Sequence, residues 1–121
     1  MLHLKKMEKE YGAAEDYYNA GLNACRQNDS KAASRLFANA AALDDRNRKF
    51  KRASLFVGPN CISSNDFCKV ALENYKEEKV LAALDLAGIA VDLDGSNEKA
   101  KKFLKKNNKH FEAIKNKLAN L

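Results

Sequence analysis

The residues able to do chemistry are few and widely separated along the 121-residue chain. His3 and His110 stand far apart, and neither has a cysteine or carboxylate at the spacing of a catalytic pair or metal site. Cys25, Cys61 and Cys68 are odd in number and form no CxxC pair, so reduced thiols are expected. The glycine-rich, zinc-binding and nucleophile motifs of common enzyme classes do not occur. The sequence therefore predicts a protein that is not an enzyme and uses no cofactor.

The paired acidic residues have structural interpretations. Asp44-Asp45 and Glu77-Glu78 fall near expected helix ends, where carboxylates favour caps and the helix dipole. The run Asp92-x-Asp94-Gly95 is similar to the middle of a calcium loop, which also requires an acid at position 90 and a glutamate at position 101. Ala90 and Lys101 stand there instead, so no metal site is predicted.

The net charge of +6 lies at one end of the chain. Residues 1–95 are neutral overall, whereas residues 96–121 hold eight lysines and two glutamates. This distribution predicts one basic helix rather than a broadly basic surface. An acidic partner, nucleic-acid phosphates or an anionic membrane would suit it, and so would a solvated capping helix. The lysines singled out on it are Lys101, Lys102, Lys105, Lys106 and Lys109.

Apolar residues recur at helical spacing, and no segment alternates with the period of a strand. Helices are expected at about 2–27 (one helix, or two joined near Gly12), 31–43, 46–57, 66–76, 78–92 and 98–119. Gly58-Pro59 ends the third, and Asn65 or Asp66 is expected to cap the fourth. The core is expected to contain Leu36, Phe37, Leu43, Phe67, Leu84 and Ile89. The sequence thus predicts a single all-α domain of about six helices.

Two stretches resemble the tetratricopeptide repeat (TPR), a pair of antiparallel helices with small and aromatic residues at fixed places. In residues 14–47 the matching positions are Tyr17, Ala20-Gly21, Ala33, Phe37, Ala40 and the ending Leu43-Asp44-Asp45. In residues 64–97 the match is weaker and includes Phe67, Val70, Ala71, Ala83, Ala87, Ala90 and the ending Leu93-Asp94-Gly95. The resemblance implies antiparallel helical hairpins in a right-handed superhelix, with an α-α bundle as the alternative.

The two endings lie 50 residues apart, whereas the family's period is about 34. Residues 46–63 would then supply an extra helix and loop, or residues 46–77 would form a degenerate middle repeat. Both registers fit the pattern. In either, residues 98–119 would form the basic C-terminal capping helix.

The resemblance also implies a groove, lined by the first helix of each hairpin, that binds a peptide or amphipathic helix of a partner protein. The groove residues would be Tyr18, Asn19, Leu22 and Arg26 in the first hairpin, and Asn65, Lys69, Leu72 and Lys76 in the second. Core packing is the other interpretation of Tyr18 and Leu22. The expected function is that of an adaptor or chaperone-like protein-binding module.

Two other classes of function stay open. The lysine-rich helix could bind nucleic acid, although its lysines are not interleaved with aromatic residues that would stack on bases. The small-residue faces and terminal helix could also pair with a second copy in a self-assembling structural protein or homodimer. No apolar run is long enough to cross a bilayer, and residues 1–10 lack the apolar core of a secretory signal. A cytoplasmic location is therefore expected.

Overall fold

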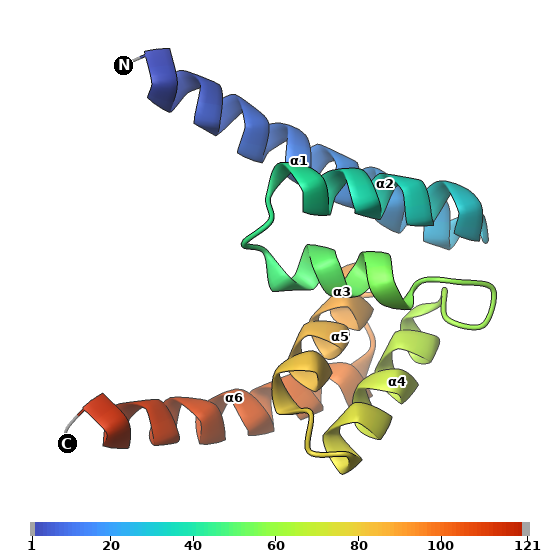
Figure 1. The fold of residues 1–121 in the computed structure, drawn as a ribbon. Coiled ribbons are helices and arrows are strands. Elements are labelled where there is room, and N and C mark those ends of the chain that lie inside the picture. The colour runs from blue at the N-terminus through green and yellow to red at the C-terminus, as the bar shows by residue number, and fades with distance from the viewer. Residues whose placement is uncertain (1, 120–121) are drawn as a thin grey trace.

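The structure is a computed structural model that describes the backbone of residues 2–119 and the side chains of residues 12–107, 116, 117 and 119. The regular secondary-structure elements within residues 2–119 are all α-helices, which confirms the predicted all-α class. The helices are α1 (Leu2–Arg26), α2 (Ser30–Leu43), α3 (Arg48–Phe56), α4 (Ser64–Lys76), α5 (Val80–Leu93) and α6 (Glu98–Ala119). Figure 1 shows α3 between the α1–α2 pair and the α4–α5 pair. No helix in this range is both long and apolar enough to cross a bilayer.

Polar side chains fix where the helices begin. Asp29 and Asn47 cap α2 and α3 by accepting backbone hydrogen bonds of 3.1 Å. The cap of α4 is Ser63 rather than Asn65 or Asp66. Ser63 Oγ accepts a bond from the Asp66 N–H, and the Asp66 carboxylate accepts one from the Ser63 N–H, so the two residues form a capping box. The predicted caps, Asn65 and Asp66, therefore lie two and three residues after the actual cap.

The chain folds as two three-helix units whose equivalent residues lie 50 positions apart. The first unit is α1–α2–α3, and the second is α4–α5–α6. In each unit the turn after the first helix contains one residue in the left-handed region, Asn28 at φ 60° and Glu78 at φ 64°. The turn after the second helix is closed by a backbone bond from Asn47 or Asn97 to the carbonyl three residues earlier. Side-chain oxygens of the same two asparagines cap α3 and α6.

The third helix of the first unit explains the 50-residue spacing. Residues 46–63 contain α3 and the loop that leads to α4, in which Gly58 and Cys61 form an isolated antiparallel bridge. The counterpart of α3 in the second unit is α6. Each unit is thus a helical hairpin followed by a third helix, and α3 is a regular part of the fold.

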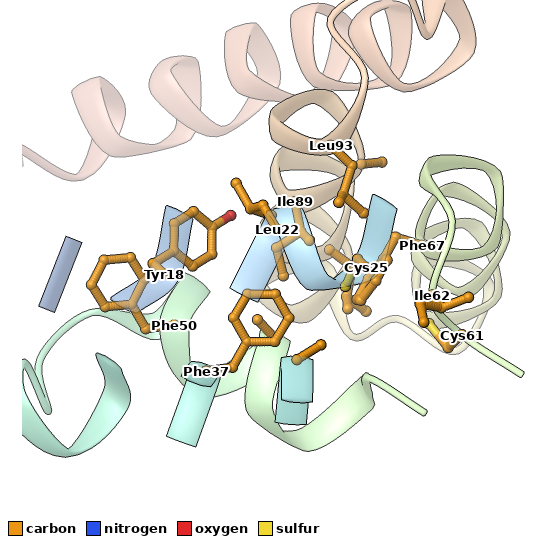
Figure 2. Close-up of a cluster of buried hydrophobic side chains, with 14 of the residues drawn as sticks. Tyr18, Leu22, Cys25, Phe37, Phe50, Cys61, Ile62, Phe67, Ile89 and Leu93 are labelled. Atoms are coloured by element: carbon orange, nitrogen blue, oxygen red, sulfur yellow. The ribbon is translucent and has the colours of Figure 1, made fainter. Parts of the chain in front are cut away.

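One hydrophobic core runs through both units (Figure 2). Its largest fully buried side chains are Phe37, Phe67, Leu86 and Ile89. Each contributes about 1.5–3 kcal/mol relative to an exposed side chain. The helix at the centre is α5, which contacts α1, α3, α4 and α6. The second unit therefore supplies the helix on which the first unit packs.

The core expected from the sequence is correct in its centre and less so at its edges. Phe37, Phe67 and Ile89 are fully buried, as expected. Leu36 and Leu84 are half-buried. Leu43 is 36% exposed and is the last residue of α2.

A close approach between α1 and α2 occurs at Gly21. A Cβ atom at this position would lie 2.5 Å from two ring carbons of the fully buried Phe37. The equivalent positions of the second unit hold Ala71 and Ala87, a slightly larger residue opposite a much smaller one. The two hairpins thus reach similar packing with different divisions of volume.

Candidate functional site

The first unit has a polar pocket of about 540 Å³ between α1 and α3, with α5 at its edge. The Tyr18 hydroxyl donates a 2.6 Å hydrogen bond to Asp92 Oδ2, and Lys49 Nζ lies 2.7 Å from the same oxygen. The Tyr18 ring stacks on Phe50 with their centroids 4.7 Å apart. Burial and the neighbouring Asp92 carboxylate raise the pKa of Tyr18, so its hydroxyl stays protonated and donates. We term this site the first-unit pocket.

Charged groups of the first unit hold α5 at two places. Arg26 donates to the backbone carbonyls of the last two residues of α5, through Nε at 3.1 Å and Nη2 at 2.9 Å. Two turns earlier on α5, Asp85 lies between Arg48 and Arg52, whose Nε atoms are 3.7 and 3.6 Å from its Oδ2. Burial raises the pKa of Asp85, and the two guanidinium groups act in the opposite direction. The cations around the first-unit pocket are therefore engaged by α5.

The equivalent surface of the second unit is an open groove between α4 and α6. Two pockets of about 330 and 320 Å³ form it and share Leu72 and Lys99. The lining residues are Asn65, Cys68, Lys69, Leu72, Glu73, Tyr75, Lys76, Lys99, Lys102, Phe103, Lys106 and Asn107. All seven residues of the larger pocket are 50-position counterparts of residues in the first-unit pocket. We term this surface the α4–α6 groove.

The α4–α6 groove is basic. Its five lysines are Lys69, Lys76, Lys99, Lys102 and Lys106. All five are exposed, and none forms an ion pair with a carboxylate among the described side chains. Glu73 is the one acidic residue in the lining. A large excess of positive charge therefore faces solvent along this groove.

An apolar strip runs between these lysines. Leu72 and Phe103 are half-buried, and Tyr75 is 42% exposed. The Tyr75 and Phe103 rings meet edge to face, with centroids 5.4 Å apart. This pair fixes the position of both rings, so the strip is an ordered contact surface rather than a set of independent side chains.

The eight residues predicted to face a groove fall into two sets. One set lines the first-unit pocket: Tyr18, Asn19, Leu22 and Arg26. The other lines the α4–α6 groove: Asn65, Lys69, Leu72 and Lys76. Tyr18 and Leu22 are each 4% exposed and lie within the core cluster of Figure 2. The members of the second set are exposed or half-buried, so that set is the one open to a partner.

The structure joins the second set to part of the predicted basic helix. Lys102 and Lys106 line the α4–α6 groove. Lys101 and Lys105 are exposed on α6 but do not line it. The side chain of Lys109 lies outside the described residues.

Sequence reasoning missed Tyr75, Lys99 and Phe103 as members of one surface. Tyr75 and Phe103 lie on helices that the hairpin pattern treated separately, and nothing in that pattern placed α6 against α4. The 50-residue spacing was the available signal, since Lys99 is the counterpart of Lys49.

The three cysteines lie in surroundings that disfavour the thiolate, because burial raises the pKa of each thiol. Burial raises the pKa of Cys25 to about 11 and that of Cys61 to about 12, so both thiols stay protonated at neutral pH. No three histidine, cysteine, aspartate or glutamate side chains cluster as metal ligands within the part of the chain that the structure describes. The α4–α6 groove offers charge and apolar contact, which are the means of recognition.

No protein-family model, curated protein or solved structure matches this chain. The α4–α6 groove is therefore the feature from which we infer a function.

Proposed function

We propose that the protein is an interaction module that holds an acidic segment of a partner protein in the α4–α6 groove. The observation that supports this proposal is the set of five lysines around Leu72, Tyr75 and Phe103 that form no ion pair with a carboxylate of the described side chains. Acidic side chains of the partner would pair with the lysines, while its apolar side chains cover the strip.

The two parts of the groove have different roles in binding. The apolar strip supplies affinity, because removing apolar surface from water contributes about 25 cal/mol per Å², and tyrosine is frequent among the residues that dominate interface energy. The lysines supply attraction and orientation, because complementary charge speeds association and disfavours partners of the wrong sign. Binding should therefore weaken as salt rises without disappearing.

The first-unit pocket is a less suitable site for an acidic partner. Its two lining cations are already engaged within the chain, since Lys49 pairs with Asp92 and Arg26 donates to the last carbonyls of α5. An added carboxylate would have to compete with these contacts. The α4–α6 groove requires no such exchange.

A peptide-display selection on the intact chain tests the proposal. Random 16-residue peptides are selected on the parent and then measured on Leu72→Glu, which places a negative charge on the apolar strip. The matched control is Leu55→Glu, because Leu55 is 74% exposed and lies outside the groove. Thermal melts establish that both variants remain folded.

We expect acidic, partly apolar peptides that bind the parent and Leu55→Glu but lose at least tenfold in affinity for Leu72→Glu. Equal binding to all three proteins would show that the groove is not the site. If no peptide is enriched and RNA binds instead, with affinity that falls steeply with salt, the lysines serve nucleic acid and the proposal fails.

A further inference from the structure

The first unit shows how part of such a surface is covered within the chain, while the first-unit pocket beside α5 stays open. One face of α5 lies on α3 through three positions, Asp85, Gly88 and Asp92. The carboxylates of the two aspartates meet cations of α3, and a Cβ at Gly88 would lie 3.5 Å from Lys49 Cδ, an ordinary contact distance. The two acids lie seven residues apart, which is two turns of helix and about 10 Å. A small residue between them lets the helices approach.

The second unit repeats the receiving surface, and within the described part of the chain no helix covers it as α5 covers the first unit. Lys99 and Lys102 are the counterparts of Lys49 and Arg52, and Lys76 is the counterpart of Arg26. In the first unit these positions bind an aspartate near the end of α5, a second aspartate two turns earlier, and the last carbonyls of α5. In the second unit all three are exposed lysines that line the α4–α6 groove.

The apolar counterparts differ in burial in the same direction. Leu22 and Cys25 of the first unit are 4% and 5% exposed beneath their neighbours. Their counterparts in the second unit, Leu72 and Tyr75, are half-buried and 42% exposed. Among the described residues, no layer therefore covers the second unit at the place where the first unit has α5.

We infer that the occupant of the α4–α6 groove is a partner helix with two carboxylates seven residues apart and a small residue between them, docked as α5 docks on the first unit. This inference rests on the proposed function and specifies the partner's shape. The carboxylate nearer the helix end pairs with Lys99, and the other pairs with Lys102. Lys76 binds the terminal carbonyls of the partner helix.

This site differs from the first unit in both its charged and its apolar residues. The counterpart of Arg48 is Glu98, so the acid near Lys102 has one cation fewer, although Lys106 also lines this end of the groove. The counterpart of Tyr18 is the buried Cys68, so Lys99 binds its carboxylate without a tyrosine hydroxyl. The Tyr75–Phe103 pair offers the partner more apolar surface than its counterparts Cys25 and Ala53.

The experiment uses a stapled helical peptide and the full chain. The peptide carries aspartate, glycine and aspartate at the spacing of Asp85, Gly88 and Asp92, with glutamine on its far face. Three control peptides have both aspartates changed to asparagine, the aspartates moved to three residues apart, or the glycine changed to leucine. The protein variant is Lys99→Glu with Lys102→Glu. Its matched control is Lys101→Glu with Lys105→Glu, the same charge change on α6 outside the groove.

Fluorescence anisotropy should show that the first peptide binds the parent and the matched control alike and binds the Lys99–Lys102 variant at least tenfold more weakly. Each of the three control peptides should also bind the parent about tenfold more weakly. A peptide with lysine at both aspartate positions should prefer the Lys99–Lys102 variant to the parent, because the charge pairs are then reversed.

The results distinguish the docked-helix inference from the proposed function. If the peptide with closely spaced aspartates or an unstructured acidic peptide binds the parent equally well and is lost in the Lys99–Lys102 variant, the docked-helix inference is wrong and the proposed function stands. Equal weakening in both protein variants would show attraction by net charge alone and overturn the inference. If no acidic peptide binds the parent, the inference and the proposed function both fail.

Discussion

Replacing Gly21 with alanine should destabilise the protein because of one steric overlap. The added Cβ would lie 2.5 Å from Cδ1 and Cε1 of Phe37, whereas carbon atoms in contact are about 3.5–4.0 Å apart. The Phe37 ring is fully buried, so it cannot move aside into solvent. Overpacking of this kind costs about 1–3 kcal/mol, and the preference of helices for alanine over glycine returns about 0.5–1 kcal/mol. We expect Gly21→Ala to lower the free energy of unfolding by about 1–2 kcal/mol.

Urea unfolding followed by circular dichroism measures this change, and the chain supplies its own control. Gly12 lies on the same helix, and no described atom is within 4 Å of the equivalent Cβ, so Gly12→Ala should be neutral or slightly stabilising. In a Phe37→Leu background the ring carbons that meet the new methyl group are gone. Gly21→Ala should then be neutral or stabilising. The reasoning is refuted if Gly21→Ala is as stable as Gly12→Ala, or if its effect is unchanged by Phe37→Leu.

Three further predictions concern buried polar groups. The Asp85→Asn variant should gain stability relative to the parent as pH rises above 3.8, the ordinary pKa of aspartate, because the raised pKa of Asp85 makes the folded parent lose stability in that range. Urea unfolding at about pH 3.5 and about pH 7 measures the difference in free energy of unfolding between the two proteins, and a difference that is the same at both pH values would contradict the prediction. Tyr18→Phe removes the hydrogen bond to the Asp92 carboxylate and should lower the free energy of unfolding by about 1.5–3 kcal/mol in the same assay. A decrease below about 0.3 kcal/mol would show that this hydrogen bond does not stabilise the fold. Burial raises the pKa of Cys25 to about 11 and that of Cys61 to about 12, so at about pH 8 both thiols should react with thiol reagents much more slowly in the native chain than in urea. Equal reaction rates in the two conditions would show that the thiols are accessible in the native chain.

The helical content and the first hairpin were predictable because their signals are local. The match of Gly21 and Phe37 to the helical-repeat pattern implied an antiparallel hairpin at residues 14–47, and Gly58-Pro59 marked the end of α3. A capping box is also local, but Ser63 was missed because Asn65 and Asp66 are equally plausible caps by residue type.

The assembly of the site was not predictable in the same way, because it depends on contacts between distant segments. Periodicity shows which face of a helix is apolar but not which helix covers it. The sequence was therefore equally consistent with Tyr18 as a groove residue and as a core residue. Its surroundings depend on a contact with Asp92, which lies 74 residues away. Likewise, Tyr75 and Phe103 lie far apart in the sequence and form one strip only because α6 follows α5 back across the second unit.

The position of α5 has a consequence for how the molecule loses its structure. Because α5 packs against α4 and α6 of its own unit and against α1 and α3 of the other, neither unit has a complete core without the other. The two units therefore unfold in a single cooperative transition despite their internal similarity. A chain cut in the loop between α3 and α4 would yield two fragments that are each incomplete. When the two fragments are mixed, they would restore the fold by complementation, with α5 of the second fragment packing against α1 and α3 of the first.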